Sequence, residues 1–211
     1  MSRKACDPEG GTDMELILVT GPQAVGKMTV GRELEKHMDA QLLYNHQTID
    51  LFARFLGYTK EAFCLSDETR KNLFRAFIKS DRNVVSGIIF TVVVAYNLES
   101  DRAFLKEVCD LFLQAGGSVF YVELEASLDI RLERNVGEDR LLAKPSKRDL
   151  GFSKNELLDT HRKHRLNSKT GEVERLLPDI HYLRIDSTLL TAAETAAAIK
   201  RWINDTSKQQ A

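Results

Sequence analysis

The sequence predicts an α/β fold, a three-layer sandwich in which a five-stranded parallel sheet lies between layers of helices. Apolar runs typical of buried strands alternate along the chain with segments whose apolar residues recur at helical spacing, and this alternation favours parallel strands. A glycine-containing loop joins the first strand to the first helix, at the edge where parallel sheets bind ligands. The expected strands are residues 15–20, 41–44, 84–90, 118–124 and 181–186.

The first strand and the helix that follows it are defined by their apolar residues. Residues 16–19 read Leu-Ile-Leu-Val, a run typical of a buried strand. In the next segment Val30, Leu34 and Met38 recur every four residues, which places them on one face of a helix. The expected helices are residues 27–38, 47–56, 67–80, 100–115, 127–135, 153–165 and 191–204.

Several helix boundaries carry local signals. Gly116-Gly117 ends one helix and leads directly into a buried-type strand. Ser153 with Glu156 has the spacing of a capping box, in which a hydroxyl and a carboxylate satisfy the first backbone N–H groups of a helix. Thr191 with Glu194 has the same spacing. Helix starts are therefore predicted at both places.

Two segments interrupt the alternation of strands and helices. Residues 46–82 insert two helices between the second and third strands, and residues 136–152 form a charge-dense, irregular segment. Both lie where a segment could close over ligands at the carboxyl ends of the strands. We expect residues 46–82 to form the acceptor wall and residues 136–152 to act as a lid. We expect one domain over residues 14–205, with flexible tails at 1–13 and 206–211.

Composition argues against several classes of protein. The chain has 211 residues and a net charge of −1, so no overall attraction to nucleic acid or to an anionic membrane is expected. Its longest apolar stretch, residues 84–96, is shorter than a membrane span. The three cysteines, Cys6, Cys64 and Cys109, have no C-x-x-C spacing and favour reduced thiols in a cytoplasmic protein. Cys109 lies in an apolar helical pattern and is expected in the core.

The loop at residues 21–29 has the spacing of a phosphate-binding loop, Gly-x-x-x-x-Gly-Lys, known as Walker A. Its glycines let successive N–H groups point at phosphate oxygens, and the following helix N-terminus adds partial positive charge. Lys27 would reach the terminal phosphates. Met28 stands where a Ser or Thr usually meets magnesium, and Thr29 follows it. The alternative is a glycine-rich turn without a ligand.

Positive charge is concentrated from Arg131 to Arg165, a segment that contains ten Lys or Arg residues and only six Asp or Glu residues. Guanidinium groups placed around a phosphoryl group stabilise the charge that develops on its oxygens, and a closed lid excludes water. The same charges could instead form a solvated helix face with pairs three or four residues apart.

The order of these elements resembles that of the small P-loop kinases, the adenylate kinase-like and shikimate kinase-like enzymes, over about residues 14–205. Adenylate kinases have a Gly after the loop lysine and then a Thr, so the resemblance implies that Thr29 contacts phosphate while magnesium is held largely through water. It also implies nucleotide stacking and lid charge from Arg131, Arg134 and Arg140. The nucleotide-binding residues implied are Gly21, Ala24, Val25, Gly26, Lys27, Met28, Thr29, Arg131 and Arg134, with Thr29 on the metal side.

The acceptor side is less defined. Shikimate kinase-like enzymes carry an acidic pair after the second strand, but residues 44–50 read Tyr-Asn-His-Gln-Thr-Ile-Asp and lack it. Asn45, His46 and Asp50 could bind an acceptor, with Asp50 or His46 taking its proton. They could equally serve the start of the next helix, as boundary residues and first-turn charge.

We therefore expect an ATP-dependent kinase that uses Mg²⁺ and moves a phosphoryl group directly to a small-molecule acceptor. The expected catalytic residues are Lys27, Arg131, Arg140 and Asp50. The alternative is a nucleotide-binding module, or a slow ATPase, that signals through lid closure without a dedicated acceptor. A kinase for nucleic-acid ends is disfavoured by the low overall positive charge.

Overall fold

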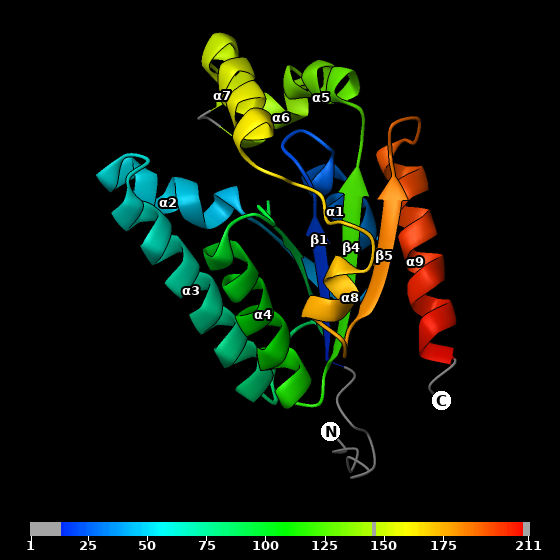
Figure 1. The fold of residues 1–211 in the computed structure, drawn as a ribbon. Helices are drawn as coiled ribbons and strands as arrows, with labels where there is room; N and C mark the ends of the chain where they lie inside the picture. Colours follow the sequence, from blue (N-terminus) through cyan, green and yellow to red (C-terminus); the bar gives the residue numbers. More distant parts are fainter. Residues whose placement is uncertain (1–13, 145–146, 209–211) are drawn as a thin grey trace, which may run out of the picture.

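A parallel sheet forms the centre of the molecule (Figure 1). The computed structural model describes residues 14–144 and 147–208, without the side chains of Asp139, Arg140 and Ala143. The sheet has five strands in the order β2-β3-β1-β4-β5, and every neighbouring pair is parallel. The predicted fold class is therefore confirmed. The strands are β1 (Glu15–Thr20), β2 (Ala40–Tyr44), β3 (Gly87–Thr91), β4 (Ser118–Glu125) and β5 (His181–Asp186).

Helices cover both faces of the sheet. One buried cluster joins alternate residues of β1, including Leu16 and Leu18, to Phe74 of α3 and Phe112 of α4. The residues between them, such as Ile17, pack in a second cluster with α1 and α9. The helices are α1 (Lys27–Glu35), α2 (His46–Leu56), α3 (Lys60–Lys79), α4 (Glu99–Gln114), α5 (Leu128–Asn135), α6 (Glu138–Ala143), α7 (Leu150–Lys163), α8 (Glu172–Leu176) and α9 (Ala192–Lys208).

The central strand explains why these segments are apolar on both faces. β1 pairs with β3 on one side and β4 on the other, so that Leu16 lies opposite both Ile88 and Val119. Because helices pack on each face, all residues of β1 after Glu15 are buried. Cys109 is also fully buried, as predicted for a core position.

Several predicted boundaries are wrong, and two of them have local reasons. The third strand begins at Gly87 rather than at residue 84, because residues 84–86 form a bend and Val84 is 94% exposed. The backbone N–H of Ser86 donates to the carbonyl oxygen of Asp39, just before β2 (3.1 Å). The helix expected from 67 begins at Lys60, where the Thr59 hydroxyl caps it by accepting from the Ala62 N–H (3.4 Å).

One of the two capping boxes is present. The backbone N–H of Glu194 donates to the Thr191 hydroxyl (3.2 Å), and the Thr191 N–H donates to the Glu194 carboxylate (2.8 Å). The box at Ser153 is wrong, because α7 begins at Leu150 with Asp149 as its cap. Ser153 is buried inside that helix, where its hydroxyl pairs with the Asn135 side chain. The Ser153 hydroxyl therefore bonds to the buried Asn135 side chain rather than to the backbone N–H group that the pattern predicted.

The segments at the carboxyl ends of the strands carry α5, α6 and α7, toward which the labelled arrows of β1, β4 and β5 point (Figure 1). The predicted lid, residues 136–152, contains the short helix α6, and residues 145–146 lie outside the described part. The predicted N-terminal tail, residues 1–13, lies wholly outside the described part. The predicted C-terminal tail, residues 206–211, begins inside a helix, because α9 continues to Lys208. None of the described helices is long and apolar enough to cross a membrane.

Candidate active site

The loop between β1 and α1 has the backbone curl that phosphate binding requires. Gly21 (φ 128°), Ala24 (φ 60°) and Gly26 (φ 111°) all adopt left-handed conformations. A Cβ atom on Gly21 would lie 2.3 Å from the carbonyl oxygen of Leu124, so β4 packs directly against the loop there. Left-handed residues between right-handed ones turn successive N–H groups to one side, which forms an anion-binding concavity.

Lys27 and Thr29 are held against the loop itself. The Lys27 ammonium donates to the carbonyl oxygens of Gly21 (2.6 Å) and Pro22 (2.7 Å). The Thr29 hydroxyl donates to the Gly26 carbonyl (3.0 Å). Met28 is 7% exposed and contributes an apolar thioether to the cavity wall at the position usually taken by a hydroxyl. The loop leads directly into the N-terminus of α1, and helix N-termini favour the binding of anions.

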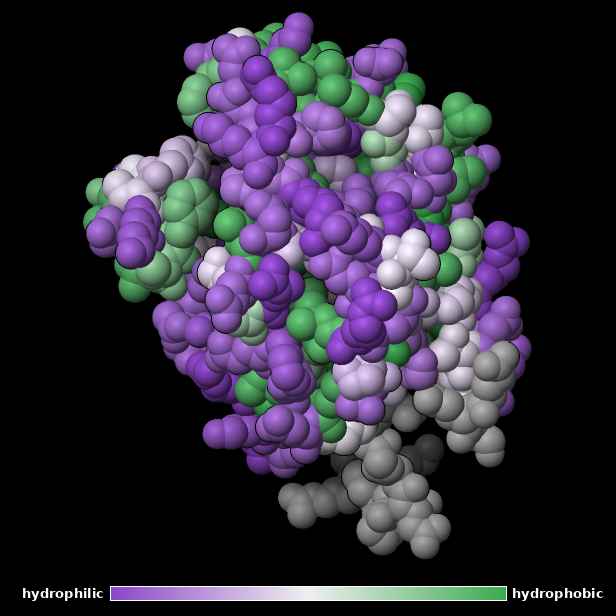
Figure 2. All heavy atoms as spheres, viewed as in Figure 1, coloured by the Kyte–Doolittle hydropathy of each residue, from purple (hydrophilic) through white to green (hydrophobic). Residues whose placement is uncertain are grey.

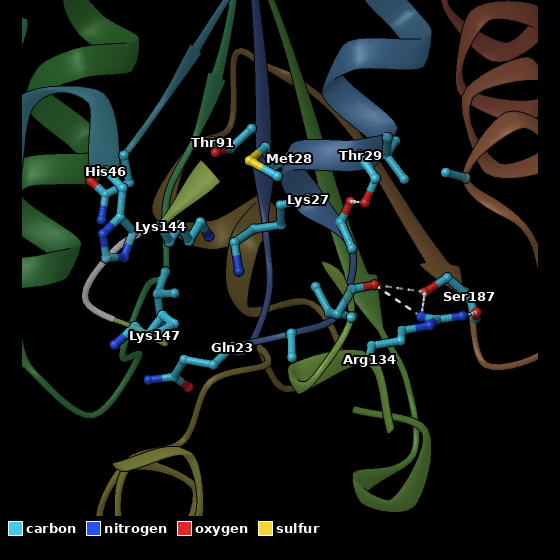
Figure 3. Close-up of a pocket in the computed structure, with 18 of the residues that line it drawn as sticks. Gln23, Lys27, Met28, Thr29, His46, Thr91, Arg134, Lys144, Lys147 and Ser187 are labelled. Atoms are coloured by element: carbon cyan, nitrogen blue, oxygen red, sulfur yellow. Dashed lines mark hydrogen bonds between the residues drawn. The ribbon is translucent and has the colours of Figure 1, made fainter. Parts of the chain in front are cut away.

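One cavity of about 610 Å³ joins this loop to the acceptor side (Figure 3). Its wall is formed by the loop and first turn of α1, the start of α2, the connection from α2 to α3, the lid, and the segment from β5 to α9. Figure 3 shows Lys27, His46 and Lys144 extending into this space from different elements. The structure thus brings the phosphate-binding loop and the predicted acceptor segment to a single site.

Arg134 of α5 connects two walls of the cavity. Its guanidinium donates to the carbonyl oxygens of Val25 (3.0 Å), Ser187 (2.7 Å) and Leu190 (3.2 Å). The phosphate-binding loop and the loop after β5 are therefore joined through one side chain (Figure 3). This position is next to the nucleotide side, where sequence reasoning expected Arg134, although its contact with a nucleotide stays a prediction.

Arg131 lies elsewhere. It is 2% exposed and does not line the cavity. Its Nη2 lies 3.2 Å from Nδ1 of His161 on α7, while its Nε and Nη1 have no hydrogen-bond partner within the described part of the chain. Burial lowers the pKa of Arg131, and burial together with this arginine lowers the pKa of His161. Arg131 therefore contacts α7 in this structure, and its predicted role toward the nucleotide stays a prediction.

The lid contributes lysines that sequence reasoning counted only as part of a charged segment. Lys144 and Lys147 both line the cavity. Lys147 is buried and forms an ion pair with Glu156 of α7, which also lines it. Arg140, predicted as catalytic, belongs to α6, but its side chain lies outside the described atoms.

His46 and Asp50 form a pair on the first turns of α2. Nδ1 of His46 lies 3.1 Å from Oδ1 of Asp50, which also accepts from the Tyr58 hydroxyl (3.1 Å). His46 lines the cavity and Asp50 lies behind it. Burial, outweighing the opposing effect of Asp50, lowers the pKa of His46, and bonds from His46 and Tyr58 overcome burial to lower the pKa of Asp50. At neutral pH the pair is therefore a neutral imidazole backed by a carboxylate, with Nε2 left as a proton acceptor.

Arg70 of α3 was not predicted, and it positions the start of α2. It is 3% exposed and donates to the Thr48 hydroxyl (2.8 Å), the Asn45 carbonyl (2.9 Å) and the Ser66 hydroxyl (2.5 Å). It also pairs with Asp67 (2.7 Å). In the sequence it is one of two arginines on an amphipathic helix, and no local signal distinguishes it from Arg75.

Comparisons with known proteins agree on the fold. A shikimate kinase from Acinetobacter baumannii superposes with a TM-score of 0.53 at 21% identity, over 92% of this chain and 94% of that chain. A gluconokinase from Sinorhizobium meliloti 1021 has a TM-score of 0.56 at 14% identity, over 94% and 99% respectively. A sugar kinase from Janibacter sp. HTCC2649 has a TM-score of 0.53 at 15% identity, over 90% and 95%. No protein-family model and no curated sequence matches the chain significantly.

These similarities define the class to which the architecture belongs: the chain has the small P-loop kinase fold. They leave the acceptor unspecified, because the solved structures of this fold include kinases with different acceptors in their names.

Proposed function

We propose that this protein is an ATP-dependent phosphotransferase that moves the γ-phosphoryl group to a hydroxyl of a small molecule. The observation that carries the proposal is the single cavity, because one continuous space is lined by the phosphate-binding loop and by His46. A nucleotide-binding module would need the loop but not a proton acceptor facing it across the same cavity.

On the donor side, the loop N–H groups and Lys27 would bind the phosphates of ATP. Lys27 would exchange its bonds to the two loop carbonyls for phosphate oxygens, since those bonds hold the ammonium at the mouth of the loop. Arg134 would support the nucleotide side by keeping the loop after β5 against Val25. Positioning and charge stabilisation would supply most of the acceleration.

The residues present fit a magnesium ion that enters with the ATP phosphates. The hydroxyl-bearing residues Thr29 and Thr91 line the cavity, and hydroxyl and phosphate oxygens are ligands that magnesium accepts. Among the described side chains, no group of three or more His, Cys, Asp or Glu could hold a metal ion alone. Magnesium usually keeps several waters and binds through substrate phosphates. When bound, magnesium would neutralise charge on the β- and γ-phosphate oxygens.

On the acceptor side, His46 would act as the base and Asp50 would position it. The acceptor hydroxyl would lose its proton to Nε2 of His46 as its oxygen forms the new bond to the γ-phosphorus. The bond from that phosphorus to the bridging oxygen breaks, and ADP leaves with the electron pair. Asp50 would hold Nδ1–H and stabilise the imidazolium that results. This assigns the proton transfer to His46 rather than to Asp50, since His46 is the one that lines the cavity.

The test is turnover of magnesium-ATP against a panel of nucleosides, sugars, hydroxy acids and amino alcohols. We expect ADP release that depends on one class of acceptor, is abolished by EDTA, and falls by at least about 10²-fold in His46→Gln. Lys27→Ala should weaken ATP binding. Equal ATP affinity in Lys27→Ala and the unmodified protein would refute the phosphate-binding assignment. ADP release that is the same with every acceptor would instead favour a slow ATPase that acts through lid closure.

A further inference from the structure

Aromatic side chains line the cavity from the helical insert between β2 and β3 and from the lid. Tyr58 follows α2, Phe63 is on α3 and Phe152 is on α7 of the lid, and all of them line the cavity. They are 51%, 43% and 59% exposed, respectively. Large apolar side chains that converge on a cavity from separate elements while half exposed are typical of a surface that a ligand covers.

The rings of Phe63 and Phe152 are not used for packing against other rings in the described part of the chain. Ring pairs there belong mainly to the core, for example Phe74 with Phe90 at a centroid distance of 5.3 Å. Figure 2 shows apolar residues on the surface both at the tip formed by α2 and α3 and over the lid. Apolar side chains of both segments, Phe63 and Phe152, therefore line the same cavity as His46.

The described cations at this end are lysines rather than arginines. Lys144 and Lys147 line the cavity, and Lys147 is already paired with Glu156. Arg134 is the one arginine among the described residues that line the cavity, and it is bonded to the loop after β5. A carboxylate acceptor is usually held by a bidentate guanidinium, and the described acceptor wall offers none.

We propose that the acceptor is a hydroxylated compound built on a flat aromatic or heteroaromatic ring, bound between Tyr58 and Phe63 on one wall and Phe152 on the lid. The hydroxyl of this acceptor faces His46. Hydroxy acids and open-chain sugars would bind poorly, because the aromatic side chains would leave their polar groups without hydrogen-bond partners. This substrate class rests on the proposed kinase function, but the ring contacts predict binding as well as turnover.

Two measurements separate the ring from the chemistry. The first is calorimetric binding, with a non-hydrolysable ATP analogue present, of adenosine and 3-hydroxymethylpyridine against gluconate and shikimate. The second is turnover of the same compounds with magnesium-ATP. We expect binding and turnover of at least one ring compound, and neither for gluconate and shikimate.

Phe63→Ala is the main variant and Phe55→Ala its control. Phe55 is on α2, 82% exposed and not part of the cavity wall, so its loss removes an aromatic from the same helical insert without touching the site. We expect Phe63→Ala to raise the KM for the ring acceptor about 10- to 100-fold, the usual effect of lost apolar contact. ATP affinity should not change, and Phe55→Ala should behave as the unmodified protein. Phe152→Ala should repeat the effect from the lid.

The outcomes are distinct. Ring binding that is lost in Phe63→Ala but is never followed by phosphorylation would retain the ring site and refute the kinase function. Phosphorylation of gluconate or shikimate in preference to the ring compounds would retain the kinase and overturn the ring site. An equal loss of activity with every acceptor in Phe63→Ala would also overturn it, because the aromatic residues would then serve only lid closure. No binding of either ring compound overturns the proposal outright.

Discussion

Replacing Arg70 by Met tests whether one buried cation holds the acceptor wall in place. The guanidinium makes four side-chain hydrogen bonds, to Thr48, Asn45, Ser66 and Asp67. Met fills much of the same volume but can donate none of these bonds. The first turn of α2, which carries His46, would then lose its attachment to α3.

The magnitude follows from the bonds and from the cost of burying the charge. A hydrogen bond to a charged group contributes about 1.5–3 kcal/mol, so the two bonds to α2 alone are worth about 3–6 kcal/mol. Burial lowers the pKa of Arg70 to about 10, which means that part of this gain is offset by desolvation of the guanidinium. We therefore expect Arg70→Met to lower the free energy of unfolding by about 3 kcal/mol, the lower end of the range for these two bonds.

Urea denaturation at pH 7 measures this difference, provided that the m-value stays constant. Arg75→Met is the matched control, because Arg75 is on the same helix and its pair with Glu107 is partly exposed, at 39% and 42%. That control should lose less than about 1 kcal/mol. Acceptor KM should rise about tenfold in Arg70→Met through misplacement of His46, with ATP affinity unchanged. The reasoning is refuted if both variants lose the same stability.

Further predictions concern the base, the nucleotide side and the loop. Burial holds the pKa of His46 below its ordinary 6.5, so kcat/KM should stay level down to about pH 6.5. At lower pH kcat/KM should fall as the base is protonated. Because Asp50 raises the pKa of His46, Asp50→Asn should move this fall to lower pH in a pH-rate profile. Arg134→Met should weaken ATP binding and speed amide hydrogen exchange in the loop after β5, and unchanged exchange would contradict the clamp. Gly21→Ala should weaken ATP binding at least tenfold in titrations, because the new Cβ would lie 2.3 Å from a backbone oxygen. Gly116→Ala is the control: Gly116 has φ 80° but open space around it, so ATP binding should not change.

The donor side of the site could be predicted because its signal is local. The loop, the strand before it and the helix after it are consecutive, so glycine spacing and apolar periodicity are visible without any tertiary information. The curl at Gly21 and Gly26 agrees with that spacing. The sequence could not show that Ala24 adopts a left-handed conformation (φ 60°), since an alanine is strained there unless its surroundings hold it.

The acceptor side could not be predicted to the same depth because its contacts are distant in sequence. Arg70 acts on Asn45 and Thr48 across a helix–helix contact, and nothing near residue 70 indicates this. The same limit applies to Arg131 and Arg134, which are one helical turn apart. Only the packing of α5 shows that Arg131 lies against α7 and Arg134 beside the phosphate-binding loop.

The sequence by itself determined the parallel α/β architecture and the place of the phosphate-binding loop, because periodicity and short-range spacing encode them directly. It left both His46 and Asp50 as candidates for the base. The tertiary structure places His46 in the cavity wall and Asp50 outside it, which supports the proposal that His46 is the base. It also places Tyr58, Phe63 and Phe152 in the wall of that cavity. Those positions depend on how α2, α3 and the lid pack around a shared space, and packing between distant segments has no local signature in the chain.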